Sequence, residues 1–199
     1  MCYPHGLIKT WRSGKAFAPG LTKSQWVRKP TGVAAPTWQR RWARYSDAMK
    51  NLDTLCELAG LVGQDVASSD WLTITQSQVN LFAQATGDHQ WIHTDPEKAR
   101  AGPFGAPIAH GFLTLSLLPQ FFASAFKVNE ARMGVNYGLN KVRFMSPVPV
   151  GSQLRAHLKL LQAAPIEPAG MQLTWQVTIE CQGVEKPSCI AESVVRLFR

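Results

Sequence analysis

The chain has 199 residues, 45% of them hydrophobic, which is enough to bury the core of about one domain. Its formal net charge of +8 lies in the first 46 residues, which hold nine Lys/Arg and no Asp/Glu; residues 47–199 hold twelve Lys/Arg and thirteen Asp/Glu, a net charge of −1. The near-neutral body has no basic face and no apolar run of about 20 residues, so we expect neither a nucleic-acid partner nor a membrane span.

Residues 1–48 are predicted to be a basic leader outside the folded domain. Four of the seven tryptophans lie there without a period of 2 or 3.6 residues, so they define no face to bury. Three interpretations stay open: a disordered arm, an organelle transit peptide, and a mis-assigned upstream start. The first and last are favoured, because Pro and Gly interrupt an amphipathic helix and an ordinary segment begins at Met49. We expect residues 49–199 to form a single domain.

The cysteines match no zinc spacing, and no secretory signal peptide precedes them. They are Cys2, Cys56, Cys181 and Cys189. We therefore expect free thiols in a reducing cytoplasm.

The domain is predicted to begin with helices and one short strand. Residues 51–63 show helical spacing of apolar side chains, and residues 70–74 alternate as a strand. A second helix begins at Thr75, because Thr75 and Gln78 match a capping box, and it ends at Gly87.

A loop, a short helix and a long apolar helix are predicted next. Residues 88–94 form the loop. Asp95 caps the short helix, which has Pro96 in its first turn and stops near Gly102. Residues 109–126 form an apolar helix without a polar face, so other elements must surround it.

The last third is predicted to be four long antiparallel strands. The clearest alternates apolar and polar side chains at every position from Met171 to Cys181. The fourth is apolar on both faces, which indicates a central position. The strands cover residues 135–146, 154–160, 171–181 and 188–198. A sheet curled around the apolar helix would bury both surfaces.

Asp88 and His93 are the candidates for acid/base chemistry. A carboxylate and an imidazole five residues apart in one loop can hold a water, take its proton and return a proton to a substrate. The structural alternative is that Asp88 caps the chain reversal and His93 lies on the surface. The flanking Gly87 and the Asp95–Pro96 pair favour the catalytic interpretation, because they constrain the loop from both sides.

A metal site is the rival interpretation of the same loop. His89, His93 and His110, with Asp88 or Asp95, offer enough ligands. The segment is not a predicted helix, so His89 and His93 are not expected on one face, and we predict no metal.

The start of the apolar helix is a candidate substrate site. Free N–H groups near His110 and Gly111 could hold a thioester carbonyl as it gains negative charge. The alternatives are that Gly111 permits close packing and that Ser116 bonds a backbone carbonyl. No nucleophile elbow and no nucleotide-binding loop is present.

These residues resemble the signature of the MaoC-like dehydratases, the R-specific enoyl-CoA hydratases: Gly-Asp-x-Asn-Pro-x-His, followed by a His-Gly that opens the central helix. The chain matches at Gly87, Asp88 and His93, and again at His110 and Gly111. The variant ATGDHQWIH, followed by IAHGFLTLS, is similar to the branch named after nodulation protein N. The resemblance covers residues 50–199.

The resemblance implies an α+β hot-dog fold, with a long central hydrophobic helix wrapped by a curled antiparallel β-sheet, and a homodimer with the site at its interface. It implies a hydro-lyase of fatty acid metabolism. Asp88 and His93 would hold the water that adds to a trans-2-enoyl thioester, carried by CoA or a carrier protein, to give a 3-hydroxyacyl thioester. No metal or redox cofactor is implied.

Further site residues follow from the resemblance. Lys141 and Arg143 are candidates for contact with the phosphates of the carrier. Gln90 and Trp91 depart from the family's Asn and Pro, so these positions are expected to affect acyl-chain preference. The predicted substrate-binding residues are Gly87, Gln90, Trp91, His110, Gly111 and Ser116. A hot-dog thioesterase and a non-catalytic acyl-CoA-binding protein remain the alternative functions.

Overall fold

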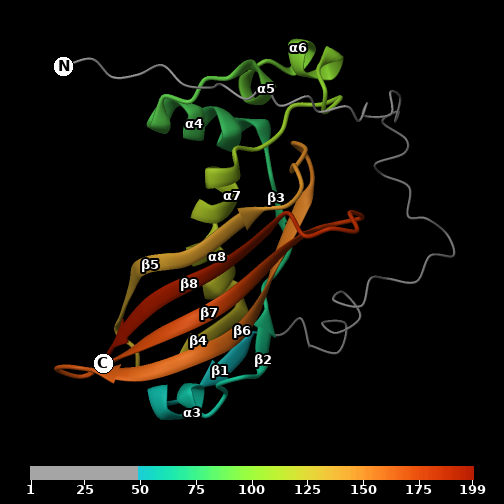
Figure 1. Cartoon of the computed structure of the whole chain (residues 1–199). Coiled ribbons are helices and arrows are strands. Elements are labelled where there is room, and N and C mark those ends of the chain that lie inside the picture. The colour runs from blue at the N-terminus through green and yellow to red at the C-terminus, as the bar shows by residue number, and fades with distance from the viewer. Residues whose placement is uncertain (1–48) are drawn as a thin grey trace, which may run out of the picture.

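The computed structural model describes residues 49–199, and the predictions for residues 1–48 lie outside this range. Figure 1 shows a curved sheet lying across the consecutive helices α7 and α8, with α4, α5 and α6 together at one end. No helix between residues 49 and 199 is long and apolar enough to cross a bilayer.

The main sheet is antiparallel throughout and has the strand order β2-β6-β7-β8-β5, with β3 also paired to β6. The four predicted long strands are confirmed, and β8 lies between β7 and β5 as its two apolar faces indicated. The strands are β2 (Asp65–Ser68), β3 (Leu72–Thr73), β5 (Met133–Phe144), β6 (Gln153–Ile166), β7 (Gly170–Cys181) and β8 (Cys189–Phe198).

The inner face of the sheet supplies much of the core. On β7, Leu173, Trp175 and Val177 are fully buried, as the alternation predicted. Each such side chain contributes about 1.5–3 kcal/mol through removal of apolar surface from water. The Trp175 ring stacks on Phe126, with centroids 5.1 Å apart, and meets Phe122 edge-on at 5.6 Å. These ring contacts join the helical layer to the sheet.

The continuous helix predicted for residues 109–126 is wrong, because the segment divides into α7 (Gly111–Ser116) and α8 (Leu118–Ala125). Pro119 lies in the first turn of α8. A proline has no N–H for the preceding turn and fits only at a helix start, so the chain begins a new helix there. The end of the segment is extended as β4 (Phe126–Val128).

The first elements are also shorter than expected. The helix predicted for residues 51–63 is only α3 (Leu55–Ala59), capped by the Thr54 hydroxyl. The residues before it form β1 (Lys50–Leu52), which pairs in parallel with β4. The short strand β2 went unrecognised, and the predicted strand 70–74 is limited to β3, because such brief segments take their conformation from pairing with β6 rather than from a pattern of their own.

The helices next to the candidate site start and stop where the local signals indicated. Thr75 and Gln78 form both hydrogen bonds of the capping box at the start of α4 (Gln76–Thr86). The Asp95 carboxylate accepts a hydrogen bond from the Lys98 N–H at the start of α6 (Pro96–Ala101). Between them the predicted loop contains one helical turn, α5 (Trp91–Thr94).

Candidate active site

A left-handed glycine directs the chain from α4 into the site. Gly87 has φ of 76°, and its N–H donates to the Ala83 carbonyl to close the helix. A Cβ on Gly87 would meet no atom within 4 Å, so the backbone angle and not space requires glycine here. The reversal places Asp88 directly beside the start of α7.

His93 is held by neighbours on both sides of its backbone. It lies near the end of α5 and is 7% exposed. Its carbonyl accepts a 2.7 Å hydrogen bond from Nε2 of Gln76, the first residue of α4. The N–H of Ile108 donates to the carbonyl of Ile92 at 3.0 Å, which brings the segment before α7 against the same turn.

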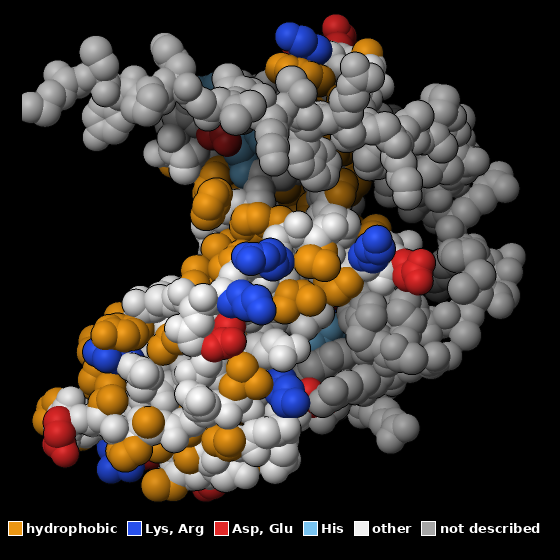
Figure 2. Space-filling model, in the orientation of Figure 1, with side chains coloured by type: hydrophobic (Ala, Val, Ile, Leu, Met, Phe, Trp, Pro, Cys, Tyr) orange, Lys and Arg blue, Asp and Glu red, His pale blue; other side chains and the backbone are white. Residues whose placement is uncertain are grey.

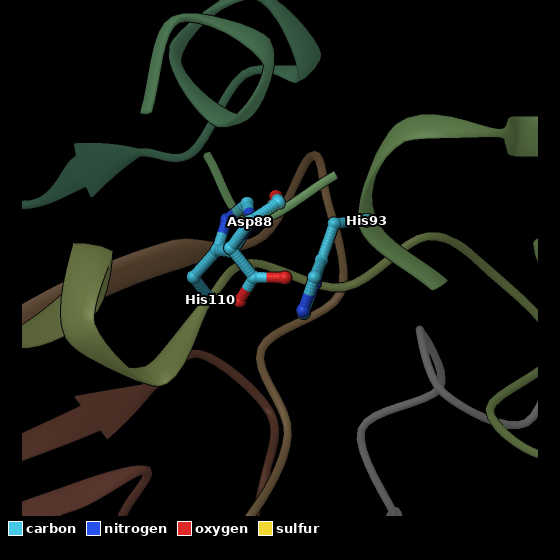
Figure 3. A group of neighbouring side chains, drawn as sticks. All are labelled: Asp88, His93 and His110. Carbon is cyan, nitrogen blue, oxygen red and sulfur yellow. The ribbon is translucent and has the colours of Figure 1, made fainter. Parts of the chain in front are cut away.

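Asp88, His93 and His110 converge although His110 is 17 residues beyond His93. One ligand atom of each lies within 4.8 Å of the others. Figure 3 shows the Asp88 carboxylate pointing toward His93, with His110 beside both. The imidazoles stack with centroids 3.8 Å apart and an angle of 28° between their planes. The predicted pair Asp88 and His93 is therefore part of a cluster of three side chains, the trio Asp88, His93 and His110.

Two backbone carbonyls determine the tautomers of the imidazoles. His93 Nδ1 lies 2.7 Å from the Ile108 carbonyl oxygen, which can only accept, so Nδ1 carries the hydrogen. Neutral His93 consequently has its lone pair on Nε2, which contacts no described hydrogen-bonding partner. His110 Nε2 lies 3.0 Å from the Asp88 carbonyl oxygen and must likewise donate. His110 Nδ1 is buried without a hydrogen-bond partner among the described residues.

The surroundings lower the pKa of His93 below its ordinary value of 6.5. Burial is the largest cause, because it disfavours the charged imidazolium. The hydrogen bond to the Ile108 carbonyl acts in the opposite direction, the positive charge that His110 can carry lowers the pKa further, and the Asp88 carboxylate raises it. The lowered pKa keeps His93 neutral at physiological pH, so the Nε2 lone pair is available to accept a proton.

The trio meets the distance requirement for a metal site but not the directional one. Each imidazole has one nitrogen already bonded to a backbone carbonyl, which leaves His93 Nε2 and His110 Nδ1 as possible ligands. A Zn²⁺ ion lies in the ring plane about 2.0–2.1 Å from its nitrogen. Two stacked rings inclined by only 28° do not bring their planes together at that distance. The geometry favours proton transfer over metal binding.

A cavity of about 340 Å³ opens beside His93. Gly111 lies on its wall, and the first residue of a helix has no intrahelical acceptor for its N–H. A Cβ on Gly111 would lie 3.1 Å from the Phe144 ring, so the predicted packing role is also present. Most other wall residues are apolar, and they include Phe104, Ile108, Phe144, Met145, Pro147 and Val148; the polar ones are Thr114, Ser146 and Ser188. The cavity suits an acyl chain whose polar end reaches His93 and Gly111.

The remaining predicted substrate-binding residues lie outside this wall. Ser116 is exposed, and its hydroxyl donates to the Phe112 carbonyl at 2.7 Å, which is the packing alternative. Thr114, one turn after His110, lines the cavity instead; its helical spacing from Gly111 could have identified it.

Trp91 and Gln90 are also not part of the cavity wall. The Trp91 ring packs on Gly102, where an added Cβ would come within 2.7 Å of it, and the Lys98 ammonium lies 5.3 Å from the ring centre. Gln90 and His89 are exposed. A direct effect of Trp91 and Gln90 on acyl preference therefore stays a prediction.

The chain is similar in sequence to a family of dehydratases and to proteins of known name. Residues 57–178 match the family model described as MaoC like domain. The chain is 52% identical over 148 residues to 3-hydroxyacyl-thioester dehydratase Z of Mycobacterium tuberculosis, a match that covers 74% of this chain and 98% of that protein. It is 44% identical over 140 residues to Nodulation protein N of Rhizobium meliloti, covering 69% of this chain and 87% of that protein.

Two solved structures show the same arrangement of elements. The Monoamine oxidase regulatory protein of Archaeoglobus fulgius superimposes with a TM-score of 0.61 at 22% identity, covering 76% of this chain and 98% of that one. The R-hydratase PhaJ1 of Pseudomonas aeruginosa, in its unliganded form, superimposes with a TM-score of 0.52 at 25% identity, covering 67% of this chain and 79% of that one.

Proposed function

This chain belongs to the MaoC-like dehydratase family, and on that basis we propose how its residues hydrate a trans-2-enoyl thioester and, in reverse, dehydrate a 3-hydroxyacyl thioester. The hot-dog α+β fold expected from the sequence is confirmed. The reaction is that of a hydro-lyase, as the names of the dehydratase and hydratase relatives indicate. The catalytic roles assigned below are our proposal.

The observation that supports this mechanism best is the pairing of two hydrogen-bond acceptors. The Asp88 carboxylate accepts only, and neutral His93 offers the Nε2 lone pair because its Nδ1–H is bonded to the Ile108 carbonyl. One water can donate one O–H to each, and its oxygen lone pair then points toward the bound substrate. Such a pair orients the water and receives its proton.

In the proposed reaction, one proton passes from the water to the Asp88–His93 pair and one proton returns from the pair to the substrate. The water transfers a proton to the Asp88–His93 pair as its oxygen bonds to C3, and the electrons of the C2–C3 double bond move toward the thioester carbonyl. The pair then returns a proton to C2, the carbonyl re-forms, and the product is the 3-hydroxyacyl thioester. Gly111 lies on the wall of the same cavity as His93, and its N–H would stabilise the enolate oxygen.

We also propose that two copies pair along β5. This strand is the last in the sheet, and an edge strand leaves N–H and C=O groups available for pairing. Its side chains at alternate positions are apolar and exposed: Met133, Val135, Tyr137 and Leu139. A two-fold axis would pair β5 with itself and cover these side chains. The free thiols of Cys56, Cys181 and Cys189 fit a cytoplasmic location.

Replacement of each member of the pair tests the catalytic proposal. Asp88→Asn keeps the shape but removes the charge, and His93→Gln keeps a polar side chain without a titratable group. Each is expected to lower kcat for hydration of a short enoyl-CoA by about 100-fold or more, with unchanged unfolding temperature. Full activity in either variant would refute the pairing. Release of free thiol from acyl-CoA by the unmodified protein would instead identify a thioesterase.

A further inference from the structure

A second hollow, of about 330 Å³, adjoins the active-site cavity. Its wall includes Lys141 and Arg143 of β5, Glu192 of β8 and Gln176 of β7. Met145, two residues after Arg143, borders both this hollow and the cavity that contains His93. A molecule extended over Met145 can therefore occupy both spaces.

The alternation of β5 explains why the two spaces differ in character. Lys141 and Arg143 are two residues apart, so they share one face of the strand, whereas Phe144 lies on the other face and packs on Gly111. Across the sheet, Lys141 pairs with Glu192, which pairs in turn with Gln176. The end of β5 thus separates an apolar cavity on one face from a row of polar side chains on the other.

The charges of the hollow are not neutralised within the described structure. Lys141 and Arg143 are exposed, and between residues 49 and 199 neither has a carboxylate within 4.0 Å. Glu192 accepts a 2.6 Å hydrogen bond from Asn140, so part of its capacity is used by a neutral group. Two cations and one carboxylate leave a net charge of +1. Figure 2 shows cationic side chains gathered with an acidic one over the middle of this sheet face.

We propose that this hollow binds the phosphate groups of the carrier arm of the substrate, an inference that rests on the proposed function. The acyl thioester would lie in the cavity beside His93, the pantetheine arm would cross Met145, and a phosphate ester or diphosphate would reach Lys141 and Arg143. Arginine and lysine pair with phosphate through charge-assisted hydrogen bonds, which are stronger than neutral ones. The same phosphate chemistry occurs in CoA and in the phosphopantetheine of a carrier protein.

Matched substrates test the subsite in the full-length protein. Crotonyl-CoA and crotonyl-pantetheine share the reacting group and the amide arm, but only the first has phosphates. The double variant Lys141→Ala/Arg143→Ala is expected to raise KM for crotonyl-CoA by about tenfold or more, with kcat unchanged and KM for crotonyl-pantetheine unchanged. The control is Lys127→Ala, which removes an exposed cation from β4 and should leave both KM values unchanged.

An unchanged KM for crotonyl-CoA, or equal losses with both substrates, would overturn the subsite. If crotonyl attached to a carrier protein shows the same loss as crotonyl-CoA, the phosphopantetheine phosphate is the group bound; a loss confined to crotonyl-CoA indicates the phosphates of the nucleotide. Calorimetric titration with CoA needs no turnover. It therefore still tests the subsite if the unmodified protein hydrates neither thioester, the result that refutes the proposed function.

Discussion

Gly87 precedes the proposed catalytic residue Asp88, and a comparison with Gly63 separates the effect of backbone strain on stability from its effect on activity. Gly87 has φ of 76° and precedes Asp88, whereas Gly63 has φ of 84° and follows α3. A Cβ at either position would meet no atom within 4 Å. Alanine at either site should therefore introduce the same backbone strain, but only at Gly87 does that strain act on Asp88, the proposed catalytic carboxylate.

The size of the effect follows from the backbone angle. An L-residue in the left-handed region costs about 1–2 kcal/mol, and alanine returns about 0.4–1 kcal/mol by restricting the unfolded chain. The net loss in the free energy of unfolding should be about 1 kcal/mol for Gly87→Ala and for Gly63→Ala. A domain of this size would then lose about 2–4 °C in unfolding temperature.

Activity should distinguish the variants. If Gly87→Ala relaxes toward ordinary backbone angles, Asp88 moves relative to His93, and kcat for enoyl-CoA hydration should fall by about tenfold or more. Gly63→Ala should keep its kcat. Gly87→Asn should recover most of the activity, because asparagine tolerates the left-handed region. Urea unfolding and the loss of enoyl absorbance measure the two quantities. Equal kcat in both alanine variants would refute the reasoning.

Four further predictions use other contacts of the site. Because the pKa of His93 is lowered, kcat/KM should keep its neutral-pH value down to and below pH 6.5. The contribution of neutral His93 to the free energy of unfolding should be fully present above pH 6.5 and should be lost as the pH falls through the lowered pKa. A decrease in kcat/KM that begins above pH 6.5 on acidification would contradict this. Gln76→Glu replaces the donor to the His93 carbonyl with an acceptor, so kcat should fall by about tenfold with little change in KM for pantetheine thioesters, and an unchanged kcat would show that this bond does not position His93. Gly111→Ala places a Cβ 3.1 Å from the Phe144 ring and should cost about 1 kcal/mol in urea unfolding; adding Phe144→Leu should restore stability, and no recovery would exclude the clash as the cause. A chain of residues 49–199 alone should retain the full kcat, and a large loss would show that the leader contributes to the domain.

Signals confined to a few neighbouring residues were readable in the sequence. The capping box at Thr75, the end of α4 at Gly87 and the cap at Asp95 each depend on contacts within about one helical turn, so they could be recognised without knowledge of distant residues. The alternation along β7 was equally clear because a strand buried on one face repeats every two residues. The spacing of Asp88 and His93, which supported the family resemblance, is likewise confined to a few neighbouring residues.

Other features depended on which segments meet in space. Nothing in the spacing showed that His110 would stack on His93, because that contact joins the start of α7 to the end of α5. Trp91 occupies a motif position but packs on Gly102, and Thr114 lines the cavity in place of Ser116. The direction of a side chain depends on the packing of its whole element, which a local pattern does not contain.

The chemical identity of the stretch around Asp88 and His93 was thus readable in the sequence, but its geometry came from the fold. Residue types and short spacings identified a carboxylate and an imidazole able to move a proton. Only tertiary structure brought the Ile108 carbonyl to His93 Nδ1, and with it the tautomer that leaves the Nε2 lone pair free to accept a proton. Local signals act through the chain over a few residues, whereas burial, stacking and cross-segment hydrogen bonds exist only after distant segments pack together.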